Sequence, residues 1–170
     1  MKEITFTFFL LIAMTSCTQA DLSTPEKNHE TYVRAFKMKN YDLWLKCFAD
    51  VSQMNKEFIA NGLDPKESIQ RMFDKINIRE SKIIERRSIS DTDAALVIRE
   101  VFDRYYGNSK YLITSTYRVR YVKMGDQWRI KDKAEQISLE GLKWQNGKYV
   151  PIEIRNSLER SNKPIETDRE

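Results

Sequence analysis

The sequence predicts an α+β fold, in which helices from the first half of the chain pack on a curved antiparallel sheet from the second half. Between residues 23 and 76, apolar side chains recur at the spacing of a helix, and capping residues interrupt them. From about residue 80 the apolar period changes to two, as in strands, and short turn signals separate the alternating segments. Helices followed by strands, with no alternation between them, indicate that the helices cover one face of the sheet.

The first predicted helix covers residues 24–39. Either Ser23 or Thr24 can cap its start, and Pro25 suits the first turn because a helix leaves that backbone N–H unpaired. Apolar side chains then recur at helical spacing up to Asn40, where we expect the helix to stop.

The second predicted helix, residues 42–49, places Trp44, Cys47 and Phe48 on one side. A cysteine among aromatic residues is typical of a core position, since free cysteine is among the most buried residue types. We therefore interpret Cys47 as a buried, inert thiol, and a nucleophilic role as the alternative.

The third predicted helix covers residues 51–61 and ends at Gly62. The fourth has the clearest start in the chain. Asp64 supplies a cap, Pro65 takes the first helical position, and Glu67 is the acid that completes a capping box. Its apolar stripe consists of Ile69, Met72, Phe73 and Ile76.

Four strands are then predicted to form a curved, antiparallel four-stranded meander. They cover about residues 80–90, 94–106, 111–124 and 127–137. One face of the third strand consists of Tyr111, Ile113, Ser115, Tyr117, Val119 and Tyr121. Because the turns between the strands are short, neighbouring strands run antiparallel.

After residue 140 the sequence predicts one more hairpin and a polar tail. Asn146-Gly147 is a strong two-residue turn signal, and Pro151 confines the second arm to the edge of a sheet. The final residues are polar and charged, and we expect them to be disordered. We therefore place the folded domain at residues 24–140 and the hairpin with its tail at 141–170.

The first 16 residues predict an export signal. A short charged start is followed by an apolar run, residues 4–14, and by the small residues Thr15 and Ser16. As a helix this run is about 16 Å long, which is short of the ~30 Å hydrocarbon core of a bilayer. The run therefore indicates a signal peptide and not a permanent membrane span.

The ending Met14-Thr15-Ser16-Cys17 resembles the lipobox of bacterial lipoproteins. The resemblance implies that the signal, residues 1–16, is removed and that Cys17 carries a diacylglycerol and an acylated amino terminus. Residues 17–23 would then form a lipidated tether. The domain would be attached to a membrane of the cell envelope, facing the periplasm or the exterior. Two or three acyl chains anchor a protein firmly, at ~0.8 kcal/mol per buried methylene.

Two alternatives to lipidation remain open. Thr18 and Ala20 form a small-x-small pattern, so ordinary cleavage after Ala20 would release a secreted protein. The other alternative is that the signal is not cleaved and itself anchors the protein in the membrane. The lipobox also departs from its most frequent form, which has leucine at the position of Met14 and glycine or alanine at that of Ser16. If Cys17 is lipidated, Cys47 has no partner for an internal disulfide.

Composition agrees with a folded exported domain. Removal of residues 1–16 from the 170 leaves 154 residues, which suits one domain, and the net charge stays at +4. Arginines and lysines on the predicted sheet could form a basic contact face, although a solvated surface is the default for such residues. Export makes nucleic acid an implausible partner.

The chain from 25 to 137 resembles the nuclear transport factor 2-like (cystatin-like) superfamily, whose cone-shaped α+β fold is shared with ketosteroid isomerase and the polyketide cyclases. Residues 36–42 resemble its helix, charged turn and helix. Residues 125–130, Gly-Asp-Gln-Trp-Arg-Ile, resemble its closing Gly-x-x-Trp-x-Ile strand. The resemblance implies a conical interior that can hold a ligand or an active site.

Our candidates for a ligand pocket in such an interior are Tyr32, Asp103, Tyr117 and Trp128. Enzymes of the isomerase branch use a buried aspartate as a proton shuttle, and Asp103 is a candidate for that role. Its structural alternative is an ion pair with a neighbouring arginine, such as Arg104, Arg118 or Arg120, on an exposed strand face. The tyrosines would be core residues in the structural alternative.

No catalytic, metal-binding or cofactor-binding residue is predicted. The single histidine, His29, is expected at the surface, because no other residue lies at metal-ligand spacing from it. The sequence contains no nucleophile elbow, no His-Glu-x-x-His and no glycine-rich phosphate loop.

We expect a lipid-anchored envelope protein that is a non-enzymatic binding or interaction module, with an envelope protein or a small molecule as its partner. The alternative is a small isomerase, dehydratase or hydrolase with a conical active site. An open apolar cavity with one buried carboxylate would favour a ligand or an enzyme. A filled interior with an exposed apolar or basic sheet would favour a protein partner.

Overall fold

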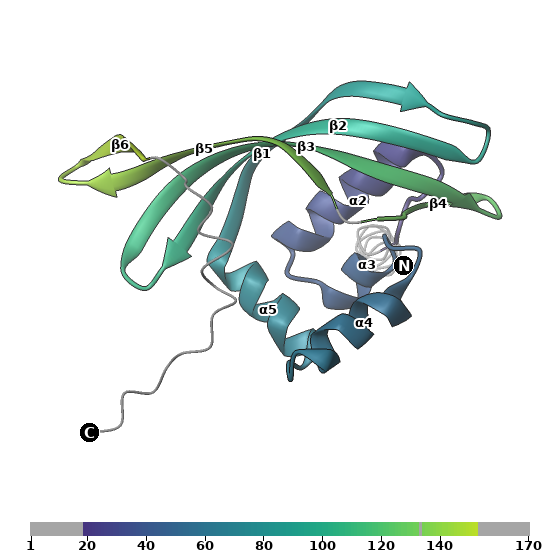
Figure 1. The fold of residues 1–170 in the computed structure, drawn as a ribbon, viewed down its shortest axis with the longest axis horizontal. Coiled ribbons are helices and arrows are strands. Elements are labelled where there is room, and N and C mark those ends of the chain that lie inside the picture. Colours follow the sequence, from purple (N-terminus) through teal and green to yellow (C-terminus); the bar gives the residue numbers. More distant parts are fainter. Residues whose placement is uncertain (1–18, 133, 153–170) are drawn as a thin grey trace, which may run out of the picture.

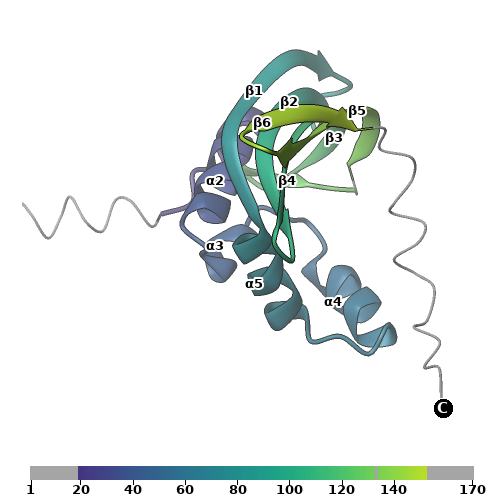
Figure 2. The same ribbon diagram turned by 90° about the vertical axis from the view of Figure 1, so that its left-hand side faces the viewer.

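Four helices precede one antiparallel sheet of six strands in the computed structural model, which describes residues 19–132 and 134–152. The helices lie together on one side of the sheet (Figures 1 and 2). This arrangement confirms the α+β prediction. Cys17 and the predicted signal lie outside the described residues, as do residues 153–170 at the other end.

The four helices lie close to the predicted positions. They are α2 (Pro25–Lys37), α3 (Tyr41–Leu45), α4 (Val51–Ala60) and α5 (Pro65–Lys75). The side chains of Thr24, Asn40, Asp50 and Asp64 cap them, each accepting a hydrogen bond from a backbone N–H in the first turn. Within the described residues, no helix has the length and apolar character needed to cross a membrane.

The second helix is shorter than predicted because the chain leaves it to join the sheet. Phe48 forms a bridge with Ile130, and the backbone N–H of Ile130 donates to the carbonyl of Cys47 at 2.7 Å. These sheet bonds replace the last helical turn that Trp44, Cys47 and Phe48 suggested.

The sheet has six strands and not the four of the predicted meander. They are β1 (Ile76–Ser88), β2 (Asp93–Tyr106), β3 (Ser109–Met124), β4 (Gln127–Ile130), β5 (Glu135–Gln145) and β6 (Lys148–Ile152). The order is β1-β2-β3-β5-β6, and β4 also pairs with β3. The sheet is therefore open, with β1 and β6 at its edges.

The predicted fourth strand, residues 127–137, is two strands. The 16 residues of β3 provide an edge long enough for both. At one end of β3, Tyr121 pairs with Ile130 of β4, and toward the other end Tyr117 and Tyr111 pair with Gln136 and Lys143 of β5.

The hairpin predicted after residue 140 is confirmed. Asn146 and Gly147 connect β5 to β6, and both have a positive φ, of 49° and 78°. Such a pair suits the right-handed twist of the flanking strands. Pro151 lies in the edge strand, as expected. β5 crosses the domain boundary placed at residue 140, and the hairpin extends beyond the helices (Figure 1).

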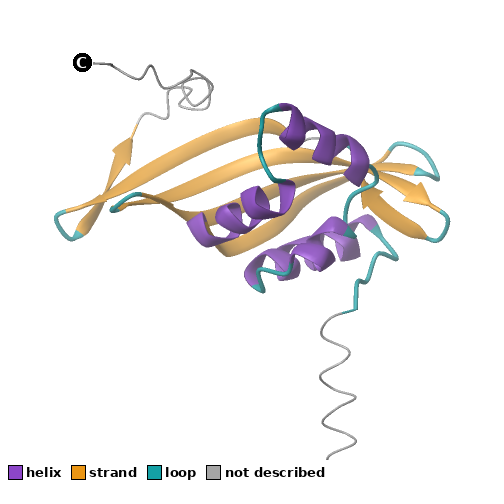
Figure 3. Ribbon diagram, turned by 90° about the horizontal axis from the view of Figure 1, so that it is seen from below, coloured by secondary structure: helices purple, strands orange, loops and turns teal. Residues whose placement is uncertain are grey.

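The helices cover one face of the sheet (Figure 3). The buried apolar side chains form two clusters. The first joins the sheet to the N-terminal segment through Leu22, which is 4% exposed. Its carbonyl accepts a hydrogen bond from the backbone N–H of Trp128 at 2.7 Å. The packed structure thus begins at or before Leu22, inside the segment that we predicted as a tether.

Candidate functional site

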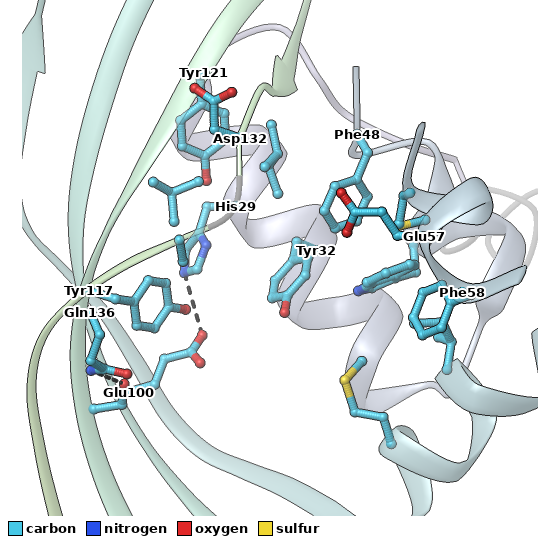
Figure 4. Close-up of a pocket in the computed structure, with 18 of the residues that line it drawn as sticks. His29, Tyr32, Phe48, Glu57, Phe58, Glu100, Tyr117, Tyr121, Asp132 and Gln136 are labelled. Carbon is cyan, nitrogen blue, oxygen red and sulfur yellow. Dashed lines mark hydrogen bonds and ion pairs between the residues drawn. The ribbon is translucent and has the colours of Figure 1, made fainter. Parts of the chain in front are cut away.

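A cavity of about 1140 Å³ lies between the helices and the sheet (Figure 4). Side chains of α2, α3, α4 and α5 form one wall, and side chains of β2, β3, β4 and β5 form the other. The interior is therefore not filled by its own side chains. Ligand sites typically measure about 300–1,000 Å³, so this cavity has room for a sizeable organic molecule.

The helical wall is largely aromatic. Tyr32, Trp44, Phe48 and Phe58 line it. The rings of Trp44 and Phe48 have centroids 4.4 Å apart, and those of Tyr32 and Trp44 are 6.4 Å apart. These aromatic side chains constrain one another, and they present a broad apolar surface to anything in the cavity.

The sheet wall carries a buried carboxylic acid, Glu100, which is 6% exposed. Ser81 donates a hydrogen bond to its Oε1 at 3.0 Å. Burial raises the pKa of Glu100, because the charged form loses water, while hydrogen bonds with Tyr117 and Ser81 act in the opposite direction. A carboxyl group with this environment can hold a proton, release it or bind a cation.

His29 belongs to the same polar cluster, contrary to the prediction of a surface histidine. It is 4% exposed, and its Nε2 lies 2.8 Å from the Ser81 hydroxyl and 4.0 Å from Glu100 Oε1. Since Ser81 donates to Glu100, Nε2–H of His29 donates to Ser81. Burial lowers the pKa of His29 to about 4, so the ring is neutral at neutral pH.

Tyr117 and Tyr121 of β3 add two hydroxyl groups to the sheet wall. Tyr121 is fully buried, and its hydroxyl has no hydrogen-bond partner among the described residues. A buried hydroxyl without a partner is costly unless something else satisfies it. Figure 4 shows Tyr121, His29 and Tyr117 in sequence along the side of the cavity that leads to Glu100.

Two of the four predicted pocket residues line the cavity and two do not. Tyr32 and Tyr117 line it. Trp128 is instead part of the apolar cluster that includes Leu22, and it is 9% exposed. Whether Tyr32 and Tyr117 bind a ligand stays a prediction.

Asp103 lies outside the cavity, in an ion pair that differs from the predicted ones. It is 2% exposed, accepts a hydrogen bond from Nε of Arg79 at 2.8 Å and lies 3.6 Å from Nζ of Lys110. Arg79 also donates to the hydroxyl of Tyr149 in β6 at 3.3 Å. Arg79 of β1 therefore connects Asp103 of β2 to Tyr149 in the C-terminal hairpin. The arginine that pairs with Asp103 is thus Arg79 and not one of Arg104, Arg118 and Arg120.

The possible basic face on the sheet is largely neutralised by acidic neighbours. Arg118 pairs with Glu135 at 2.8 Å, and Arg120 and Lys131 lie 3.9 and 3.4 Å from Asp93. Exposed pairs of this kind contribute little to stability, but they cancel the local charge. This favours the solvated surface that was the default expectation.

Glu100 was not among the predicted pocket residues, although the sequence contains a signal for it. In the strand that became β2, Leu96, Ile98, Glu100 and Phe102 alternate on one face, and Leu96 and Ile98 are fully buried. An acid that continues such an apolar face is a candidate buried carboxylate.

No protein-family model matches the sequence, and no curated protein matches it either. Among solved structures, one SEC-C motif containing protein from Rhodopseudomonas palustris superimposes with a TM-score of 0.54. The chain has distant structural similarity to SEC-C motif containing proteins. The identity to the first is 12%, over 68% of this chain and 80% of the other.

A second SEC-C motif containing protein, from Psychrobacter arcticus, gives a TM-score of 0.47 at 14% identity, over 71% of this chain and 66% of the other. At such identities the likeness to the Rhodopseudomonas protein extends to the α+β fold alone. Within the described residues, no group of three or more His, Cys, Asp or Glu side chains is placed to hold a metal ion.

Proposed function

We propose that this protein binds a small organic molecule with a large apolar body, and that a lipidated Cys17 holds it at a membrane of the cell envelope. The cavity carries the first part of the proposal. It measures about 1140 Å³, has an aromatic wall and contains a buried carboxyl group. An apolar cavity with a few convergent polar groups is the usual form of a small-molecule site.

The nuclear transport factor 2-like assignment belongs to the same proposal. What supports it is the order of elements, with helices first and a curved antiparallel sheet second, together with a cavity between the two layers. The lipobox resemblance supports the lipid anchor, and Cys17 itself lies outside the described residues.

An enzyme is the second candidate, and one observation favours it. Glu100 is a buried acid with a raised pKa, and it lies beside Tyr117 in the cavity. A general acid or base needs a pKa displaced in this way. A binding protein would release its ligand chemically unchanged, whereas an enzyme would convert it. Mass spectrometry of the released molecule distinguishes the two candidates.

A cavity-filling variant tests the binding proposal. Met54 and Met72 line the cavity from α4 and α5. Replacing both by tryptophan (Met54→Trp with Met72→Trp) should weaken binding of Nile red, a neutral apolar dye, at least about tenfold, because two indoles occupy space that the dye needs. Fluorescence titration measures the affinity.

The matched control places the same two substitutions outside the cavity. Met38 and Met124 are 47% and 53% exposed and do not line it. The variant Met38→Trp with Met124→Trp should bind the dye as the wild type does. Equal affinities for wild type and both variants, or no dye binding by the wild type, would rule out the cavity as a binding site.

Two single cysteine-to-serine variants test the lipid anchor. Cys17→Ser should move the protein from the membrane pellet to the soluble fraction, because acylation at Cys17 is the proposed attachment. Cys47→Ser is the control, since Cys47 is fully buried and should leave the attachment unchanged. An unmodified Cys17 thiol, or an amino terminus at Asp21, found by mass spectrometry of the native protein would contradict the anchor.

The anchor would keep the domain close to the membrane. Only five peptide units separate Cys17 from the buried Leu22, and an extended chain of that length spans at most about 18 Å. The lipidated tether is thus shorter than the segment 17–23 suggested.

A further inference from the structure

The described lining of the cavity is acidic, although the protein as a whole is basic. Glu57, Glu100 and Asp132 line it, and none of the described lining residues is Lys or Arg. Asp132 lies 3.7 Å from Arg120, so Glu100 is the acid of interest for a ligand. The complete chain has 29 Lys and Arg residues and a net charge of +4. A cleft whose walls carry one sign of charge raises the local concentration of ions of the other sign.

Glu100 in particular has no cation beside it in the described part of the protein. Its only ion-pair contact within 4.0 Å is with His29, and the pKa of His29 is about 4, so this ring carries no charge at neutral pH. Lys37 lowers the pKa of Glu100 only from beyond ion-pair distance, so an ionised Glu100 would be a buried charge with no charged partner in contact, which is costly. A ligand cation would compensate it.

Tyr121 gives an independent indication of a ligand. Its side chain is fully buried, it lines the cavity, and its hydroxyl has no hydrogen-bond partner among the described residues. Native structures rarely leave such a group unpaired. A ligand with a polar group near the sheet wall would supply the missing partner.

The helical wall is suited to a cation with an apolar body. In Figure 4, Tyr32 lies between Glu100 on the sheet side and Phe48 on the helix side. Aromatic faces attract ammonium groups, and most strongly where water is excluded. An ammonium near Glu100 would therefore also lie near an aromatic ring, while the rest of the molecule contacts Trp44, Phe48 and Phe58.

We infer that the ligand of this cavity is an organic cation, an amine or quaternary ammonium with an apolar body, whose charge lies at Glu100 and whose body lies on the aromatic wall. The inference rests on the proposed binding function and specifies its ligand class.

Three probes with one apolar body test the charge preference: phenylbutylamine, phenylbutanol and phenylbutyrate. They differ in carrying an ammonium, a hydroxyl or a carboxylate. Titration calorimetry at neutral pH should give the amine an affinity at least about tenfold above that of the alcohol, and the carboxylate the weakest affinity of the three.

Glu100→Gln should reduce the preference for the amine over the alcohol at least about fivefold, because only the aromatic wall then still attracts the ammonium, while the alcohol binds as before. The control is Glu140→Gln, which changes the net charge equally. Glu140 is exposed on β5 and does not line the cavity, so this variant should keep the preference of the wild type.

The possible outcomes distinguish a failure of the cation inference from a failure of the proposed binding function. Amine and alcohol binding equally to the wild type would overturn the cation inference and leave the binding proposal in place. A preference of the same size in Glu100→Gln and in the wild type would overturn the role of Glu100. Failure of every probe and of Nile red to bind would overturn the binding proposal itself.

Discussion

Asn28→Asp should lower the free energy of unfolding by about 3–5 kcal/mol. Asn28 is fully buried in α2, and its Nδ2 donates to the carbonyls of Cys47 at 3.1 Å and Trp128 at 2.8 Å. Aspartate has no hydrogen to donate to either carbonyl when ionised. The variant would remove both hydrogen bonds and would place a buried carboxylate against two carbonyl oxygens, although the carbonyl of Cys47 keeps its bond from the backbone N–H of Ile130. Urea unfolding followed by circular dichroism measures the change.

Asn40→Asp is the matched control, because it makes the same chemical change where the side chain accepts. The Oδ1 of Asn40 caps α3 by accepting from the backbone N–H of Leu43 at 2.9 Å. Aspartate is as good a cap as asparagine, so stability should change by less than about 0.5 kcal/mol. Similar losses for both variants would show that Asn28 does not act as a donor.

The two hydrogen bonds of Asn28 matter for the candidate site because they join two segments that line the cavity. The carbonyl of Cys47 immediately precedes Phe48, and that of Trp128 lies two residues before Ile130. Phe48 and Ile130 both line the cavity. Asn28 thus holds the end of the helical layer against β4 at a fixed distance, and the cavity keeps its shape there.

The parts of the fold that could be predicted are those with local causes. The caps at Thr24 and Asp64 and the turn at Asn146-Gly147 act through backbone groups only a few residues away, so their sequence patterns suffice. The split of the predicted last strand into β4 and β5 depends on how much of β3 remains free for pairing, which is a property of the assembled sheet.

The candidate site could be predicted only in part, for a related reason. Tyr117 was predicted because apolar and aromatic side chains alternate along its strand, and Tyr32 because it lies on the apolar face of one helix. The cluster of His29, Ser81 and Glu100 draws on α2, β1 and β2, and no spacing along the chain relates these residues. Its formation depends on the register between strands and on the position of the helix above them.

Acidification should destabilise the protein through His29 by about 3 kcal/mol. The folded chain holds the pKa of His29 at about 4, whereas the ordinary value is 6.5, because burial disfavours the charged ring. Between these two values the unfolded chain binds the proton and the folded chain does not. The stability from His29 is therefore present above about pH 6.5 and is lost as the pH falls toward 4.

Comparison with His29→Gln isolates this effect. Glutamine retains an N–H that can donate to Ser81 but has no group that titrates in this range. The wild type should lose about 3 kcal/mol relative to the variant between pH 7 and pH 4, measured by urea unfolding at each pH. A parallel decline of wild type and variant would show that His29 is accessible to protons in the folded state.

The contribution of Glu100 to stability depends on pH in the opposite direction. The effect of His29 is therefore measured as a difference between the wild type and His29→Gln. Burial raises the pKa of Glu100, so its contribution to stability is present at low pH and is lost as the pH rises through its folded value. The two effects have one cause, the low exposure of both side chains, which are 4% and 6% exposed. Because this burial keeps His29 neutral, the histidine cannot compensate a negative charge on Glu100. A cation bound in the cavity could compensate that charge.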